Sequence, residues 1–203
     1  FSVTLTRPAP SIQPVSVTYA TVNGTATSGS DYTATSGTLL FPGGSAGSST
    51  FFVTVIINGD TLNEAGENFF VDLSAATGGA VIVDPRGVGT IANDDGVPVV
   101  SSGNVTVTEG NAGSLVATFV LRLSVLSGQT VRVEYATANG TASAGAGLGG
   151  SDYVSRSATL TFAPGETTKN VDVTVNGDAT YELAETFALN LSGAVNATIG
   201  TNG

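Results

Sequence analysis

The chain has 203 residues, with sixteen acidic residues against six basic ones and a formal net charge of -10. This balance argues against binding to nucleic acid or to an anionic membrane surface, both of which need basic patches. Cysteine and histidine are absent, which excludes a disulfide framework, a thiolate zinc site and an imidazole base. No stretch approaches the ~18 consecutive apolar residues of a membrane-spanning helix. Since the sequence does not begin with Met, we expect a processed product or part of a longer chain.

Short runs of alternating apolar and polar residues begin at the first residue, and this period of two is typical of half-buried β-strands. Clusters of Gly, Pro, Asn, Asp and Ser separate the runs. No segment combines a helical period with helix caps. The first half therefore predicts strands over residues 1–6, 13–22, 38–41, 50–57, 68–73 and 87–91.

The second half of the sequence repeats the first. Residues 131–142 match residues 15–26 almost one for one, and Ser151-Asp152-Tyr153 matches Ser30-Asp31-Tyr32. A repeat of more than a hundred residues is a whole domain, too long for a solenoid unit. Short strands at turn-punctuated intervals are typical of immunoglobulin-like sandwiches. The fold prediction is therefore all-β, with two tandem immunoglobulin-like sandwiches.

The two predicted domains, residues 1–96 and 97–203, meet at a short Gly/Pro connection. The first lacks the leading strand that the second has at 104–109, and the second lacks a counterpart of the closing strand at 87–91. Either the chain samples a longer tandem array, or each missing strand comes from a neighbouring molecule, because an open sheet edge recruits strands. Both interpretations predict self-association in an array or a filament.

An acidic loop precedes the predicted strand at 68–73, and a second one precedes its counterpart in the other copy; each loop carries an Asp followed by Glu four and seven residues later. Three carboxylates within eight residues repel one another unless they are well solvated or share a cation. A solvated turn is the usual explanation for one such loop, but the recurrence of the spacing favours a shared cation. The six residues are Asp60, Glu64 and Glu67, then Asp178, Glu182 and Glu185.

The motifs resemble those of the Calx-beta family of calcium-binding sandwich domains. They are Tyr-Ala-Thr-x-Asn-Gly-Thr-Ala at 19–26 and 135–142, Ser-Asp-Tyr, Phe before Pro-Gly, Glu-x-x-Glu-x-Phe at 64–69 and 182–187, and Ile-x-Asn-Asp-Asp at 91–95. The resemblance covers nearly the whole chain and implies calcium at one end of each sandwich. It implies eleven metal ligands: Asp31, Asp60, Glu64, Glu67, Asp94, Asp95, Glu109, Asp152, Asp178, Glu182 and Glu185.

Calcium accepts six to eight oxygen ligands without strict geometry, so clustered carboxylates suit it on chemical grounds as well. The alternative for these sites is decay, since neither copy holds the full ligand set and a motif match is only a hypothesis. An enzyme is not predicted. Paired carboxylates could hydrolyse glycosides, but Trp is absent, and without His no Ser triad can form.

Two functions remain. The first is a calcium-stabilised structural or adhesive repeat module of an extracellular surface or filament protein, in a bacterium. The second, implied by what the family does in ion exchangers, is a pair of regulatory calcium-sensor domains within a larger protein.

Overall fold

The computed structural model describes residues 1–145 and 151–200, in which the regular elements are β-strands and no helix occurs. No described segment could therefore cross a membrane as a helix. The chain forms two compact units: unit 1 comprises Phe1–Asp60 and Ala65–Asn93, and unit 2 comprises Thr61–Glu64 and Asp94–Gly203. The all-β prediction is confirmed.

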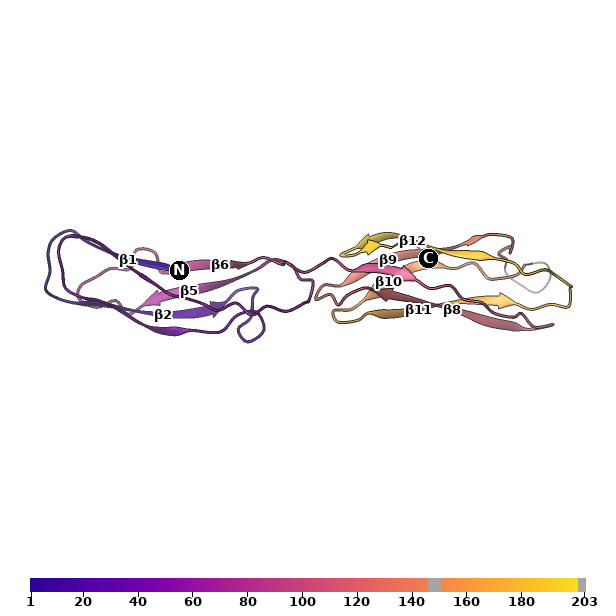
Figure 1. The fold of residues 1–203 in the computed structure, drawn as a ribbon, viewed down its shortest axis with the longest axis horizontal. Helices are drawn as coiled ribbons and strands as arrows, with labels where there is room; N and C mark the ends of the chain where they lie inside the picture. Colours follow the sequence, from indigo (N-terminus) through magenta and orange to yellow (C-terminus); the bar gives the residue numbers. More distant parts are fainter. Residues whose placement is uncertain (146–150, 201–203) are drawn as a thin grey trace. The chain divides into compact units, whose positions relative to one another are not determined.

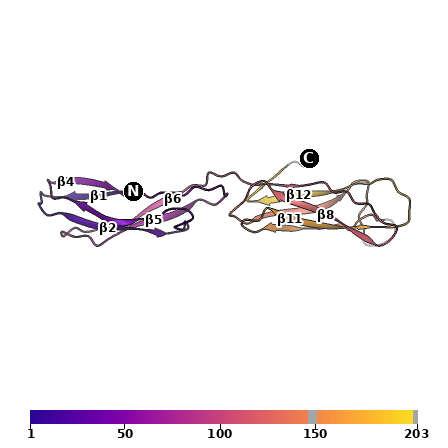
Figure 2. The ribbon, with the colours of Figure 1, turned by 60° about the horizontal axis from the view of Figure 1, so that its bottom comes forward.

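Unit 1 consists of two antiparallel sheets that face each other (Figures 1 and 2). The smaller sheet pairs β1 (Ser2–Arg7) with β4 (Gly47–Phe52). The larger sheet has, in spatial order, β3 (Ser36–Phe41), β2 (Val15–Asn23), β5 (Glu67–Ser74) and β6 (Arg86–Ile91). The connection from β4 to β5 crosses from one sheet to the other, and it carries the first acidic loop.

Unit 2 repeats this plan with two differences among the described residues: the counterpart of the smaller sheet has two more strands, and the counterpart of the larger sheet has three strands instead of four. One sheet has the order β10 (Ser157–Phe162), β9 (Val131–Asn139) and β12 (Phe187–Val195). The other has the order β11 (Thr168–Asn176), β8 (Ser114–Leu123), β7 (Val99–Ser102) and β13 (Thr198–Ile199). The β7–β13 pair is parallel and the other pairs are antiparallel. The second acidic loop crosses between the sheets from β11 to β12 (Figure 1).

Alternation of side chains along the strands builds the core. On β9, Val131, Val133 and Tyr135 are buried, while the residues between them are exposed. A strand turns successive side chains to opposite faces, and full burial of one Val contributes about 1.5–3 kcal/mol. The strand acids Asp72 and Asp172 belong to the outer face: Asp72 pairs with Arg86 at 2.6 Å, and Asp172 accepts a hydrogen bond from Thr118 at 2.7 Å.

Two predicted strands are placed differently in the structure. The run over 50–57 extends past the end of β4, because the ladder with β1 ends at the Ser2–Phe52 pair. The leading strand of unit 2 is β7 rather than residues 104–109. Val105 and Val107 do pack against the core, so their alternation reflects side-chain burial, whereas backbone pairing with β8 is made by Val100 to Ser102.

Candidate metal centre

The residue Asp152 is fixed in position by hydrogen bonds that link the two sheets of unit 2. It lies between β9 and β10, and its backbone carbonyl accepts a hydrogen bond at 2.9 Å from the amide of Asn176, the last residue of β11. Its Oδ2 accepts bonds from the backbone N–H of Ser143 at 2.6 Å and from the Ser143 hydroxyl at 3.2 Å. The carboxylate is therefore held beside the start of the acidic loop.

The acidic loop brings two glutamates to this aspartate. One carboxylate oxygen from each of Asp152, Glu182 and Glu185 lies within 4.8 Å of the other two. Asp152 is half-buried and the two glutamates are exposed. The three side chains come from two connections that join different strands, so they are neighbours only in the folded unit.

The electrostatics of this group are those of crowded carboxylates. Loss of surrounding water raises the pKa of Glu182, and the charges of Asp178, Asp152 and Glu109 raise it further. The pKa of Glu185 is also raised, first by loss of water and then by the charge of Asp152. Each proton that the group gains relieves repulsion between like charges, and a bound cation would relieve the same repulsion.

Unit 1 reproduces the arrangement around Asp31, which lies between β2 and β3. Its backbone carbonyl accepts a bond from the amide of Asn58 at 3.0 Å, and its Oδ2 accepts one from the amide of Thr27 at 2.6 Å. The candidate group in the first copy of the sequence repeat is Asp31, Glu64 and Glu67, again with one oxygen from each residue within 4.8 Å of the others. All three are half-buried.

Five of the eleven predicted ligands lie outside these two groups: Asp60, Asp94, Asp95, Glu109 and Asp178. Two of them remain part of the local electrostatics, because Asp178 and Glu109 lie close enough to raise the pKa of Glu182. The Asp178 carboxylate accepts a bond from the backbone N–H of Thr180 at 2.7 Å, so it caps the first turn of the loop. The group that converges is thus smaller than the predicted set.

The sequence analysis missed the two asparagines that accept hydrogen bonds from the tyrosines next to Asp152 and Asp31. The hydroxyl of Tyr153 donates to Oδ1 of Asn139 at 2.6 Å, and Tyr32 donates to Oδ1 of Asn23 at the same distance. The signal was present in the repeated Asn-Gly-Thr-Ala, whose Asn receives a Tyr hydroxyl in both copies.

The donor chemistry fits calcium. All ligating groups are carboxylate oxygens, which hard cations prefer, and calcium accepts irregular oxygen shells, whereas magnesium requires near-ideal octahedral geometry. The sequence contains neither Cys nor His, so the nitrogen and sulfur ligands typical of zinc are missing. Three carboxylates leave coordination positions for water and backbone oxygens.

Comparison with known proteins gives two kinds of relative. The chain is 31% identical over 191 residues to sodium/calcium exchanger 2 of Rattus norvegicus and of Homo sapiens, a match that covers 86% of this chain and 20% of each exchanger. It is 30% identical over 197 residues to sodium/calcium exchanger 1 of Felis catus, covering 87% of this chain and 19% of the exchanger. The chain thus spans about a fifth of the length of these curated relatives.

Among solved structures, the chain is similar to the crystal structure of calcium binding domain CBD12 of CALX1.1, with 24% identity and a TM-score of 0.41, covering 96% of this chain and 72% of that one. The crystal structure of CBD12 from CALX1.2 matches with 25% identity and the same TM-score, covering 96% and 73%.

These relatives correct the first functional hypothesis. The prediction of a structural or adhesive module of a surface or filament protein is wrong, because the matching curated proteins are sodium/calcium exchangers, in which the match covers a part of a larger protein. The sequence analysis gave too much weight to the tandem repeat itself, because the match to the exchangers also extends over most of both copies.

The family model of the Calx-beta domain matches the chain twice, over residues 1–96 and 92–200. The two matches together cover nearly the whole chain, and they coincide with the motifs from which the resemblance was drawn. This chain belongs to the Calx-beta family and contains two copies of its domain in tandem.

Proposed function

We propose that both units bind Ca²⁺ and that together they form a calcium-sensing regulatory segment of a larger protein. The observation that carries the proposal is the convergence of Asp152, Glu182 and Glu185 within 4.8 Å, in a group whose two glutamates have raised pKa values. Calcium is the metal predicted from the sequence, and membership of the Calx-beta family bears that prediction out.

The site can act as a sensor because its ligands lie on connections between different strands. Glu182 and Glu185 belong to the crossing from β11 to β12, and Asp152 belongs to the connection from β9 to β10. A cation bound by all three would join the ends of the two sheets and order the acidic loop. Removal of the cation would leave like charges within a few ångströms of one another, and the loop would open to separate them.

The regulated activity would reside elsewhere in the polypeptide. The curated relatives are named sodium/calcium exchangers, and the matched part is about a fifth of each. We propose binding rather than catalysis for this segment. The sequence contains no His, so no imidazole base is available beside the acidic groups. The extracellular location rested on the adhesive hypothesis and is not proposed further.

Calorimetric titration of the full chain with CaCl₂ tests the proposal. The variant Glu185→Gln removes one charge from the group, and we expect its calcium affinity in unit 2 to fall by about tenfold or more, which corresponds to ~1.4 kcal/mol. The matched control is Glu134→Gln, which removes the same charge from an exposed position on β9. Equal affinity in both variants and in the unsubstituted chain would remove this group from the calcium site.

A further inference from the structure

The strand β4 forms one edge of the smaller sheet of unit 1, because it pairs with β1 alone in the part of the chain that the structure describes (Figure 2). In an antiparallel pair, alternate residues turn their backbone N–H and C=O groups toward the partner strand, and the others turn them away. Val53 and Phe1 exchange two such bonds, of 2.8 and 2.9 Å, so the odd-numbered residues of β4 face β1. The backbone groups of Ser48, Thr50 and Phe52 therefore point away from β1, along an open edge.

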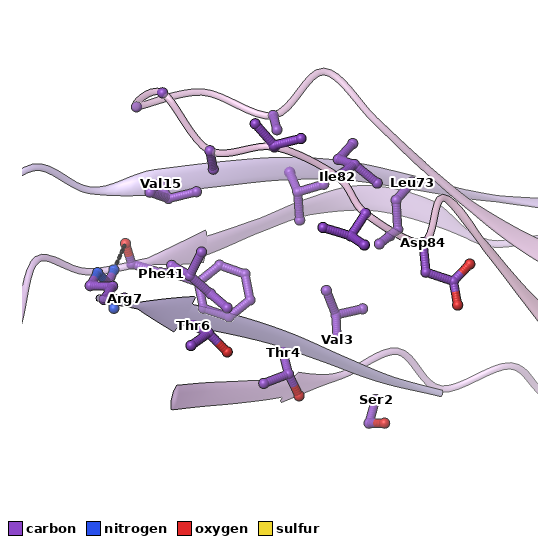
Figure 3. A pocket seen from close by; sticks show the side chains of 18 of the residues that line it. Ser2, Val3, Thr4, Thr6, Arg7, Val15, Phe41, Leu73, Ile82 and Asp84 are labelled. Carbon is purple, nitrogen blue, oxygen red and sulfur yellow. Dashed lines mark hydrogen bonds between the residues drawn. The ribbon is translucent and has the colours of Figure 1, made fainter. Parts of the chain in front are cut away.

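The side chains at this edge are neutral and lie on the outer face of the sheet. Ser48 and Thr50 are exposed, and Phe52 is 75% exposed. The hydroxyls of Thr50 and Thr4, on neighbouring strands, share a hydrogen bond of 2.8 Å, and Figure 3 shows Thr4 and Val3 on opposite sides of β1. The edge thus presents backbone groups that face away from β1, together with hydroxyls and one exposed phenyl ring.

The sequence around this edge carries no charge. Residues 32–59 contain no Asp, Glu, Lys or Arg, and this range includes β3 and β4, which are edge strands of the two sheets of unit 1. Natural edge strands often carry charged side chains, which prevent pairing with other chains. With a net charge of -10, two copies of this chain repel each other, and the repulsion is weakest where neither surface is charged. The β4 edge is therefore the side on which a second copy approaches at least cost.

The corresponding strand of unit 2, β11, is also an edge strand, but it carries charges. The register is shared, because adding 118 to Thr4 and to its partner Thr50 gives a pair that β8 and β11 also form. By this offset, Ser48, Phe51, Phe52 and Thr54 correspond to Glu166, Lys169, Asn170 and Asp172. Glu166 and Lys169 form an ion pair at 2.8 Å. Charged side chains thus protect the edge of unit 2 against strand pairing, whereas the edge of unit 1 lacks them.

We propose that the β4 edge is an interface between two copies of this chain, which pair β4 with β4 in antiparallel orientation about a twofold axis. The outward backbone groups of Ser48, Thr50 and Phe52 bond to those of the second copy, and the ring of Phe52 packs against the outer face of the second copy's strand. Pairing of one strand with itself is isologous, so it closes a dimer. This inference does not depend on calcium binding.

A strand from a different protein is the main alternative occupant, because it could bond to the same backbone groups by strand addition. A charged strand would find no opposite charge within residues 32–59 to fix its register. A second copy brings the same neutral alternation of hydroxyl and apolar side chains, so no charge on either side loses its water without a partner. Self-pairing therefore fits the edge better than a charged foreign strand does.

Sedimentation equilibrium of the full chain over a series of concentrations tests the proposal. We expect a monomer–dimer equilibrium, and we expect Phe52→Lys, which places a charge in the interface, to raise the dimer dissociation constant at least about tenfold. The matched control is Val88→Lys, the same kind of change at a residue of β6 that is 62% exposed. The proposal is overturned if the chain is monomeric at about 1 mM, or if the two variants dimerise equally.

Hydrogen exchange at single amides locates the interface. The odd-numbered amides of β4 face β1 and should exchange slowly at every concentration, whereas those of Ser48, Thr50 and Phe52 should become protected only as the dimer forms. A chain that carries Phe52→Asn and Thr54→Asp together has the residues of unit 2 at these positions. It should lose the concentration dependence and keep the odd-numbered amides protected, which shows that the sheet is intact. Exchange of the three outward amides that does not change with concentration in the unsubstituted chain would overturn the proposal.

Discussion

The ring of Tyr153 stacks on the ring of Phe187, with centroids 4.4 Å apart and planes inclined by 16°. Tyr153 directly follows Asp152, and Phe187 comes two residues after Glu185, so the stack places two ligands of the candidate centre side by side. Unit 1 contains the same pair, Tyr32 on Phe69, at 4.5 Å and 19°. The recurring Glu-x-Phe and Asp-Tyr motifs are therefore one structural device that holds the carboxylates together.

The variant Tyr153→Phe keeps the stack and removes the hydroxyl that donates to Asn139 at 2.6 Å. Because the amide oxygen then loses a buried partner, we expect the free energy of unfolding to fall by about 1–2 kcal/mol and calcium affinity to weaken as Asp152 shifts. Urea denaturation and calcium titration measure the two effects. Tyr135→Phe, on β9, serves as the control for loss of a buried tyrosine hydroxyl, and an equal effect there would argue against a specific role of Tyr153.

Glycine at position 140 permits a close approach to the acidic loop. A Cβ added at Gly140 would lie 2.4 Å from the backbone carbonyl oxygen of Thr186, so the backbone must move. We expect Gly140→Ala to destabilise the chain by about 1–3 kcal/mol and to lower calcium affinity by displacing Glu185. The matched change is Gly103→Ala, where an added Cβ meets nothing within 4 Å. If the two variants have equal melting temperatures, the contact with Thr186 is not a constraint.

Removal of one charge from the acidic group should have opposite effects with and without calcium. In calcium-free buffer, Glu182→Gln relieves repulsion from Asp178 and Asp152, so we expect a small rise in melting temperature. With saturating calcium, the same variant loses a ligand and should melt below the unsubstituted chain. Differential scanning calorimetry in chelator and in calcium separates the two effects, and Glu64→Gln is the corresponding change in the first copy of the repeat. A shift of the same sign in both buffers would contradict the assignment.

Calcium affinity should fall with falling pH. Because the pKa values of Glu182 and Glu185 are raised above 4.5 in the folded chain, protons bind this group at a higher pH than they bind the unfolded chain. In the metal-free chain, protonation therefore adds stability as the pH falls through the raised pKa values, and that stability is lost as the pH rises through them. Protons and calcium compete for the same oxygens. Titrations at a series of pH values should show the weakening begin above pH 4.5, whereas an affinity that is constant down to that pH would refute the competition.

Much of the fold could be predicted because alternation, turn residues and the repeat all indicate the same architecture. The bounds of β2 and β6 differ from the predicted 13–22 and 87–91 by two residues at most. The failure at 104–109 has a physical reason: the apolar period reports which side chains are buried, while the ladder depends on a partner strand that the sequence does not identify. The parallel pairing of β13 could not be predicted from two residues.

All six residues of the two carboxylate groups were among the eleven predicted ligands, but the sequence did not show which of the eleven lie together. The spacing of the acidic loop placed Glu182 and Glu185 on one connection, but it did not show which carboxylates turn toward Asp152. The loop instead directs Asp178 to the amide of Thr180. The supporting Asn139 was missed because an Asn-Gly pair is typical of turns, and its contact with Tyr153 spans 14 residues of sequence.

Calcium should stabilise the chain, since a ligand that binds only the folded state raises its stability by ~2.7 kcal/mol at one hundred times its dissociation constant. Magnesium should substitute weakly because it dehydrates reluctantly. The melting temperature should therefore rise with added calcium and fall in chelator.

The most direct measurement is calorimetric calcium titration of the full chain beside a chain that carries Asp152→Asn, Glu182→Gln and Glu185→Gln together. The account predicts calcium binding by the unsubstituted chain and loss of the unit 2 site in the triple variant, while the Glu134→Gln control stays unchanged. Identical titration curves for the triple variant and the unsubstituted chain would contradict it.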